Sequence, residues 1–426
     1  MSFHKREEEN AQGGPNGGYL KSSQRRMRRV PFLLILICLF MQSAAWAEAW
    51  KLNGTFAAKE EYNDNLFFDD NSREDDFVTT ISPGLQLSHR SERLQLGLLG
   101  RLDRRIYHSN SGLNATDQFY QGTFRYAPSP RVGLSGLAEY KRDSSPDRDL
   151  EITGLVLSDK KRQTQRYVLS GDYTFSEKTS AALSYEYFKE DYDSEEESDL
   201  ESGSVNLLLL HDLSFLTPAM QGRLNIGYSH YSFTDTKIDS YGASIGVSKA
   251  FSETWNIVVD VGARYTQSEF EVREVRFVPP IFYQLVKVDK EDDGWGGIGK
   301  AILTYRGEKS TLDVMFSHDL SAASGRNGAT NRTNVGFRMS RRFTYEWSGY
   351  LSGSYYWNKS DRDEYSVEEI NEETFSVNTG VKYDLTKDYS LDASYTYTRT
   401  KDKVDDEEPE RNLFMIRFNI QHDFLE

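Results

Sequence analysis

The sequence predicts an all-β fold, a transmembrane antiparallel up-and-down β-barrel of about 18 strands. Three observations carry this prediction. Between residues 50 and 424, apolar and polar residues alternate with a period of two, as in strands that have one face in lipid and one in water. Long acidic connections alternate with short turns along the same stretch. A secretory signal precedes the first strand.

The N-terminal region has the parts of a secretory signal peptide. Four arginines between residues 25 and 29 precede the apolar run 30–40, and Ala45 and Ala47 form a small-residue cleavage site. The run is shorter than the roughly 20 apolar residues with which a helix crosses a bilayer. We therefore expect cleavage after Ala47, which makes residues 1–47 an N-terminal extension and signal peptide.

The mature chain is acidic and lacks cysteine. Cys38 lies inside the signal, so disulfides, thiolate metal sites and cysteine nucleophiles are excluded after cleavage. Without residues 1–47 there remain 44 basic and 63 acidic side chains, a formal net charge of −19. We expect no nucleic-acid partner for so acidic a chain, and no cofactor. Met27 can serve as the true start, because residues 27–47 make an ordinary signal peptide alone.

Period-two alternation assigns two faces to each strand. One face is apolar and the other is polar, as in an outer-membrane barrel whose outer surface meets lipid. The apolar faces include Leu52, Phe56, Ala58 and Tyr62; Leu94, Leu96, Leu98 and Leu102; Trp255, Ile257, Val259, Val261, Ala263 and Tyr265; and Leu312, Val314 and Phe316.

Connections between the strands alternate in length. Long ones are expected at residues 63–76, 108–117, 143–163, 189–202, 234–239, 269–293, 320–330, 358–373 and 400–410, with the fifth the shortest. Short Gly, Pro and Ser turns lie between them. A long-loop-first order with an even strand count places both termini in the periplasm. A single barrel over residues 48–426 accounts for the whole mature chain.

Aromatic residues gather near strand ends. They include Tyr185, Tyr187, Tyr192, Tyr228, Tyr231, Tyr355, Tyr356, Trp357, Tyr395 and Tyr397. Their half-polar rings suit the girdles that barrels carry at both membrane interfaces, although aromatic residues also favour strands in general. The last strand alternates and ends with Phe424, a terminal signal for the barrel assembly machinery.

Two stretches of the first hairpin carry a family resemblance. Residues 61–67 (EYNDNLF) and 76–85 (DFVTTISPGL) resemble the outer-membrane β-barrel porins often encoded in exopolysaccharide gene clusters. The resemblance covers about 25 residues at the motif level. It implies an outer-membrane exit for a secreted polysaccharide, with periplasmic polysaccharide-export components as partners beside outer-membrane lipid and lipopolysaccharide.

Polar faces are expected to line the lumen. The lumen-lining candidates are Arg101, Asp103, Arg105, Arg125, Lys141, Arg166, Arg223, Arg264, Lys300, Arg332, Arg338, Arg342, Lys382 and Arg417. Basic residues exceed acidic ones on this face, which favours a weak anion preference. The alternative is that these charges pair across strands and fill a polar interior. Arg332, Arg338 and Arg342 on one strand are the clearest exception to pairing.

Other chemistry is weakly indicated. The acidic segments 190–199 and 405–408 lack the spacing and the glycine of a calcium loop, so we expect solvated surface. The six mature histidines show no metal-site spacing. His230 and His318 have serine neighbours, but adjacent strand residues point to opposite faces, so no catalytic residues are predicted and we do not expect an enzyme.

The function expected from the sequence is transport across the outer membrane of a Gram-negative cell. An exit channel for exopolysaccharide is the first hypothesis, because the family resemblance implies it. A general diffusion porin for small solutes and a non-transporting surface scaffold or adhesin are the alternatives. The apolar segment within residues 268–293 is a candidate for an inward constriction or gate.

Overall fold

The computed structural model describes residues 50–144, 150, 153–155, 161–194, 197–278, 282–323, 325–362 and 364–424. The chain divides into two units, Met1–Glu48 and Ala49–Glu426, of which the second contains the described residues. The expected signal peptide, with Ala45, Ala47 and Met27, lies outside them. In the described part, no helix is long and apolar enough to cross a membrane.

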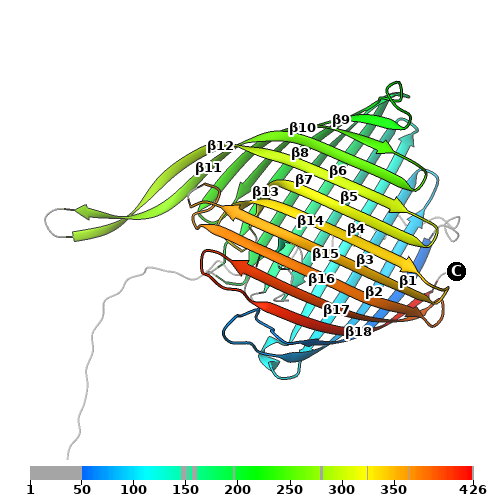
Figure 1. Cartoon of the computed structure of the whole chain (residues 1–426), viewed down its shortest axis with the longest axis horizontal. Coiled ribbons are helices and arrows are strands. Elements are labelled where there is room, and N and C mark those ends of the chain that lie inside the picture. Colours follow the sequence, from blue (N-terminus) through cyan, green and yellow to red (C-terminus); the bar gives the residue numbers. More distant parts are fainter. Residues whose placement is uncertain are drawn as a thin grey trace, which may run out of the picture. The chain divides into compact units, whose positions relative to one another are not determined.

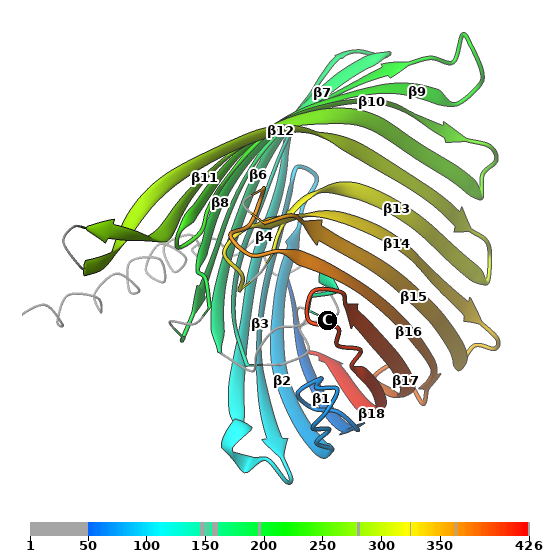
Figure 2. The same cartoon turned by 60° about the vertical axis from the view of Figure 1, so that its left-hand side comes forward.

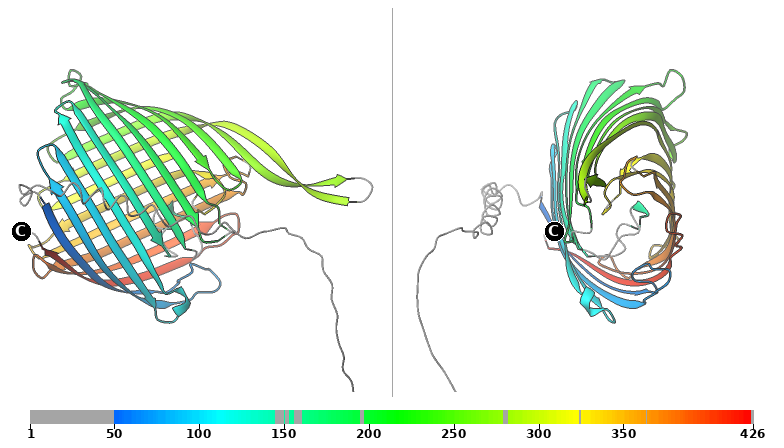
Figure 3. Two further views of the ribbon diagram at one scale, coloured as in Figure 1. Left: turned by 180° about the vertical axis from the view of Figure 1, so that it is seen from behind. Right: turned by 90° about the vertical axis from the view of Figure 1, so that its left-hand side faces the viewer.

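Eighteen antiparallel strands form one closed sheet, which confirms the predicted fold (Figure 1). They are β1 (Trp50–Asn63), β2 (Asp76–Arg90), β3 (Leu94–Tyr107), β4 (Ala115–Ser129), β5 (Val132–Asp143), β6 (Arg162–Ser176), β7 (Thr179–Tyr192), β8 (Leu200–Asp212), β9 (Met220–Ser232), β10 (Thr236–Ala250), β11 (Trp255–Val278), β12 (Phe282–Arg306), β13 (Ser310–Ala322), β14 (Ala329–Arg342), β15 (Trp347–Ser360), β16 (Ile370–Asp384), β17 (Tyr389–Asp402) and β18 (Glu410–Asp423). Each strand pairs with its neighbours in sequence, and β1 pairs with β18, so the sheet has no free edge (Figure 3). A closed sheet satisfies its backbone groups without water, which lipid requires.

The alternation of long and short connections holds with exceptions. Longer loops follow most odd strands and short turns follow most even ones, but the connection after β9 is only residues 233–235, whereas the one after β8 is residues 213–219. The expected loop at residues 269–293 is instead a continuation of β11 and β12, whose pairing runs up to Val278 and Phe282. This hairpin extends beyond the ends of the other strands (Figures 1 and 3). It is therefore not the inward constriction that the sequence suggested.

Strand register assigns every strand residue to one of two faces. Side chains such as Leu98, Leu169 and Val261 are large, apolar and exposed, and all of them lie on the same face around the ring. The opposite face carries buried polar side chains, among them Asn358 and Thr374. An apolar face turned to lipid around a polar interior is the pattern of an outer-membrane barrel.

Aromatic rings pair across strands at two levels of the wall. Near the long loops, ring centroids lie 5.0 Å apart in Tyr228–Tyr241 and 5.4 Å apart in Tyr265–Trp295; near the short turns, Trp255 and Tyr305 are 4.8 Å apart. Ten residues separate the two levels on β11, which is about 33 Å along a strand and about 25 Å along the axis at a tilt of about 40°. That height matches the apolar band of a barrel.

The predicted girdles thus exist, but their membership needs correction. Tyr185, Tyr187, Tyr228, Tyr355, Trp357, Tyr395 and Tyr397 lie on the lipid face, whereas Tyr192, Tyr231 and Tyr356 lie on the inward face. The cause is the strand period, since neighbouring residues of one aromatic cluster must point to opposite faces.

Polar residues of the first hairpin fasten the ends of strands. The Asp64 carboxylate accepts hydrogen bonds from the Asn412 backbone N–H at 2.6 Å and from Asn412 Nδ2 at 2.7 Å, where β1 meets β18. Asp76 is 1% exposed and accepts the backbone N–H groups of Ser109 and Asn110, both at 2.9 Å. The acidic residues in the resembling stretches therefore close the ring and order the loop after β3.

We expect Asp76→Ala to lower the free energy of unfolding by about 2–4 kcal/mol, because it leaves several buried N–H groups without their charged acceptor. Urea titration of the barrel in lipid vesicles measures this loss. Asp70→Ala is the matched control, since Asp70 is exposed in the loop that precedes β2. Equal effects of the two substitutions would show that the Asp76 contacts do not support the loop.

Candidate functional site

The strand register places all fourteen predicted lumen residues on the inward face. Arg101, Asp103 and Arg105 follow one another at alternate positions of β3, and Arg332, Arg338 and Arg342 share the inward face of β14 at spacings of six and four residues. The others lie singly on β4, β5, β6, β9, β11, β12, β16 and β18. The strand register alone gives this placement. Whether a charged group is available to a solute depends on whether it is already paired with another side chain.

Most of these charges are paired. The pairs are Arg101–Asp103, Arg105–Asp117, Lys141–Asp143, Arg166–Glu186, Arg223–Asp260, Arg264–Asp319, Lys382–Asp384 and Arg417–Asp392, at N–O distances from 2.5 to 3.6 Å. Each acidic partner lies on the inward face of the same strand, of the neighbouring strand or of the strand after that, as the cross-strand alternative predicts. The excess of positive charge is therefore concentrated in the few cations that stay unpaired.

Four of the predicted cations make no ion pair within the described ranges: Arg125, Lys300, Arg338 and Arg342. Arg332, in contrast, makes several hydrogen bonds to the wall. Its guanidinium donates to Asn358 Oδ1 at 2.8 Å, to Ser321 Oγ at 2.7 Å and to the Ala322 carbonyl at 3.1 Å. The three arginines of β14 are thus unequal, because Arg332 supports the wall while Arg338 and Arg342 face the lumen.

Part of the segment between β5 and β6 lies inside the barrel. Where β5 ends, the Ser144 hydroxyl donates to Asp117 at 2.9 Å, and residues 153–155 lie against β15 and β16. In the ring, β5 and β15 are eight strands apart one way and ten the other, so this segment reaches the nearly opposite wall. Residues 153–155, and not residues 268–293, therefore occupy part of the lumen.

Side chains of β15 and β16 donate hydrogen bonds to backbone carbonyls of this segment. Asn358 Nδ2 donates to the Thr153 carbonyl at 3.0 Å, and the Thr374 hydroxyl donates to the Gly154 carbonyl. Gly154 has a φ of +71°, and a Cβ there would lie 2.5 Å from Cβ of Tyr356. Only glycine combines that conformation with so close an approach.

Apolar contacts complete this anchor. Leu155 is fully buried and forms a cluster with Ala323 of the β13–β14 loop and with Ile370 of β16. Burial of a leucine stabilises the contact by about 1.5–3 kcal/mol. The sequence contains a signal for this anchor, because residues 150–157 carry five apolar side chains in a segment flanked on both sides by polar residues.

A second inward element is the loop between β13 and β14. The Gly325 carbonyl accepts the Ser198 N–H at 2.9 Å, and the Asn327 side chain accepts the Asp235 N–H at 3.2 Å. Leu320 belongs to a buried cluster with Ile238 of β10 and with other residues of this end. Several loops therefore meet at the outer end and narrow the opening from that side.

Below the narrowing, the inner wall of β13 to β17 forms a cavity of about 400 Å³. Hydroxyl and amide groups dominate its lining: Asn334, Ser352, Ser354, Ser376, Asn378 and Thr396, with Arg338 as the cation and with Asp313, a carboxylate that pairs with Arg306 at 2.9 Å. Neutral hydrogen-bonding groups and one free guanidinium suit polar or anionic solutes.

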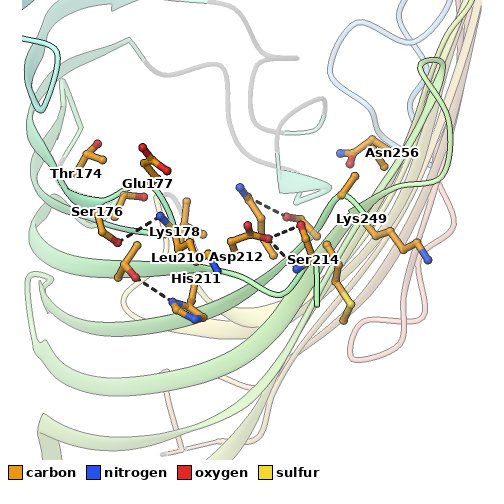
Figure 4. A pocket seen from close by; sticks show the side chains of 17 residues that line it. Thr174, Ser176, Glu177, Lys178, Leu210, His211, Asp212, Ser214, Lys249 and Asn256 are labelled. Atoms are coloured by element: carbon orange, nitrogen blue, oxygen red, sulfur yellow. Dashed lines mark hydrogen bonds between the residues drawn. The ribbon is translucent and has the colours of Figure 1, made fainter. Parts of the chain in front are cut away.

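A wider cavity of about 470 Å³ lies at the opposite end, among the short turns that join β6 to β7, β8 to β9 and β10 to β11. Figure 4 shows Lys178, Asp212 and Lys249 around it. The Asp212 carboxylate accepts the Ser214 N–H at 2.7 Å, and the Lys249 ammonium donates to Thr217 at 2.7 Å. Its charges are of both signs, so this mouth is polar without a strong preference.

The acidic segments contact neighbouring basic groups. Glu190 is 1% exposed and pairs with Arg162 at 2.8 Å, and Glu408 contacts Arg399 at 2.5 Å and also Lys401. Hydrogen bonds from Lys401 and Arg399 hold the pKa of Glu408 below its usual value. Among the described residues, no group of three or more His, Cys, Asp or Glu side chains is placed to hold a metal ion.

Comparisons with known proteins give a partial family match. Residues 271–418 match a family described as "Putative MetA-pathway of phenol degradation". No curated protein matches. OccK2 (OpdF) of Pseudomonas aeruginosa is 8% identical with a TM-score of 0.47, over 89% of this chain and 100% of that one. OccAB4 of Acinetobacter baumannii is 11% identical with a TM-score of 0.45, over 88% and 98%.

Eighteen strands enclose a lumen wider than side chains of the wall alone can fill. The apolar outer band, the two girdles and the polar interior are the features of proteins of the bacterial outer membrane. The chain is an outer-membrane β-barrel with the architecture of a channel.

Proposed function

We propose that the protein is a diffusion channel for small polar solutes, with its narrowest part at the loop between β5 and β6. The observation that carries the proposal is the pair of hydrogen bonds that Asn358 and Thr374 donate to backbone carbonyls of that loop. A segment that reaches the nearly opposite wall divides the lumen, and a divided lumen passes small solutes more readily than a polymer. The matched family description also names a small solute, phenol.

Wall chemistry supports polar cargo. The cavity below the narrowing is lined by hydroxyls and amides, which replace the hydrogen bonds that a solute loses with its water. Arg338 adds a positive charge, which favours anions over cations in a narrow passage. The class of solute that this lumen fits best is small, hydroxylated and neutral or anionic.

Release of the loop between β5 and β6 should widen the channel. We expect the double variant Asn358→Leu, Thr374→Val to raise single-channel conductance roughly twofold, because the loop loses both hydrogen-bond donors of the far wall. Planar-bilayer recording of the refolded protein gives the conductance. Gln121→Leu with Thr123→Val is the matched control, since these residues lie on the inward face of β4, outside the cavity of β13 to β17, and make no described contact with residues 150 or 153–155. An unchanged conductance in the first variant would remove the loop from its role as constriction.

Selectivity should depend on the unpaired arginines. We expect neutralisation of Arg332, Arg338 and Arg342 to glutamine to shift the reversal potential in a salt gradient toward cations. The Arg338→Gln, Arg342→Gln pair should account for most of the shift, because Arg332 makes several hydrogen bonds to the wall. Arg104→Gln is the control, since Arg104 lies on the outer face. Equal reversal potentials in wild type and the triple variant would contradict an anion preference.

Polysaccharide export is the second candidate. The resemblance of residues 61–67 and 76–85 implies it, and the hydroxyl- and amide-lined wall of β13 to β17 favours it, because such groups hydrogen-bond to sugars. If this candidate holds, deletion of the gene should reduce surface polysaccharide by an order of magnitude, roughly as for loss of a required exit. An unchanged amount, with normal ion conductance of the purified barrel, would leave the small-solute channel alone.

A further inference from the structure

The wall has a break in its hydrogen bonding between β12 and β13. Their pairing runs from Arg306 and Thr311 to Gly299 and His318 and ends there, although β12 continues toward Phe282. Beyond this point, residues 319–322 of β13 pair only with β14 within the described chain. Figure 2 shows β12 leaving the neighbouring strand at this end. Among the described residues, no other two neighbouring strands leave so long a stretch of one strand unpaired with the other.

The break lies at the level of the outer leaflet. The Tyr265–Trp295 ring pair marks the outer girdle, and Trp295 is 77% exposed. Gly299 is four residues nearer the periplasm on the same strand, about 13 Å along it. The strands therefore part below the outer interface, where the surroundings are acyl chains and not water.

Glycine dominates β12 where it leaves its neighbour. Residues 294–299 read Gly-Trp-Gly-Gly-Ile-Gly, so four of six positions have no side chain. A Cβ on Gly297 would meet nothing nearer than 3.8 Å, whereas a Cβ on Gly296 would lie 2.7 Å from Cζ of Arg264. The glycine at 296 thus makes room for one side chain that passes across the strand.

That side chain, Arg264 of β11, bridges the break. Its Nη1 donates to the Gly297 carbonyl at 2.8 Å and to Asp319 Oδ1 at 3.2 Å, and its Nη2 donates to Asn331. The arginine is 1% exposed. Where backbone pairing is missing, one guanidinium therefore connects β11 and β12 with β13 and β14.

Behind the bridge lies a cavity of about 160 Å³. Its wall belongs to both sides of the break: Asn206, Asn225, Ser229, Tyr231, Ser240 and Ser244 come from β8 to β10, Ile298 from β12, and Asp319 and Leu320 from β13. Amides and hydroxyls lie beside an aromatic ring and two aliphatic side chains. Such a mixed lining accommodates a molecule with an apolar body and one polar group.

We propose that the break between β12 and β13 is a lateral portal, latched by Arg264, through which small amphipathic molecules pass between the lumen and the outer leaflet. Passage needs no rupture of backbone hydrogen bonds, since none join the strands there. It needs displacement of the guanidinium from Asp319 and Asn331 and a shift of the end of β13, where Leu320 packs in a cluster with Ile238 of β10. This route is independent of axial diffusion, so the two can fail separately.

Variants that release the latch test the proposal. We expect Arg264→Ala and Gly296→Ala each to raise uptake of the apolar amine N-phenyl-1-naphthylamine by intact cells about tenfold, because each removes the charged bridge. Arg223→Ala and Gly297→Ala are the matched controls. Arg223 forms a buried ion pair with Asp260 at 2.8 Å within continuously paired strands, and Gly297 has open space around a new Cβ. Heat-modifiable gel migration verifies that each barrel is folded.

A variant that covers the break should have the opposite effect on probe uptake. Gly297 lies on the lipid face, so Gly297→Phe should cover the portal and reduce uptake of the same probe severalfold, while single-channel conductance stays unchanged. Gly203→Phe is its control, on the lipid face of β8 with 3.7 Å to the nearest atom. The portal is refuted if uptake in the latch variants equals that in their controls, or if Gly297→Phe leaves uptake as in wild type. A fall in conductance alone would concern the channel and not the portal.

Discussion

Backbone hydrogen bonding in lipid is the constraint on which the rest of this structure depends. Each unpaired N–H or C=O in the hydrocarbon region costs several kcal/mol, so the sheet must close on itself. The ring is completed by pairing of β1 with β18, with Asp64 and Asn412 fastened at its outer end. The parting of β12 from β13 is the exception, and it coincides with a buried guanidinium that satisfies groups on both sides. The closed wall and its break thus follow from one requirement.

Inside the wall, charge is used mainly to build structure. Eight of the predicted lumen cations are paired with carboxylates, and Arg332 is held by an amide, a hydroxyl and a carbonyl. A wide lumen filled in this way presents a nearly neutral surface, on which a few unpaired cations such as Arg338 have a large influence. The strongly acidic loops lie outside this balance, because their carboxylates contact nearby basic groups such as Arg162 and Lys401.

Much of the fold could be read from the sequence, because a barrel repeats one pattern. Each strand alternates, most odd strands are followed by a longer loop, and parity assigns residues such as Arg101 and Arg417 to the inward face. Sequence prediction failed where the position of a residue in the strand period and its chemical type suggest different locations. Tyr231 and Tyr356 look like girdle residues but face inward, and the prolines near residue 280 suggested a folded loop where paired strands continue.

The interior could not be predicted in the same way. Contacts such as Asn358 with Thr153 join residues more than two hundred positions apart, and no local period encodes them. The apolar stretch that contains Leu155, with Ile152, Val156 and Leu157 close by in the sequence, was the one visible sign. Arg264 was assigned to the lumen, but its role as a bridge depends on the missing pairs beside Gly299, which no sequence pattern reveals.

The glycine run on β12 also determines how the barrel comes apart. A strand with four glycines in six positions has the least side-chain packing and the greatest backbone entropy to gain on release. Unfolding should therefore start between β12 and β13 and proceed as two arcs, β1 to β12 and β13 to β18, that remain joined through β1 and β18. If assembly reverses this order, β12 and β13 are the last strands to pair. The part of the mature wall with the fewest hydrogen bonds is then also the part that closes last during folding.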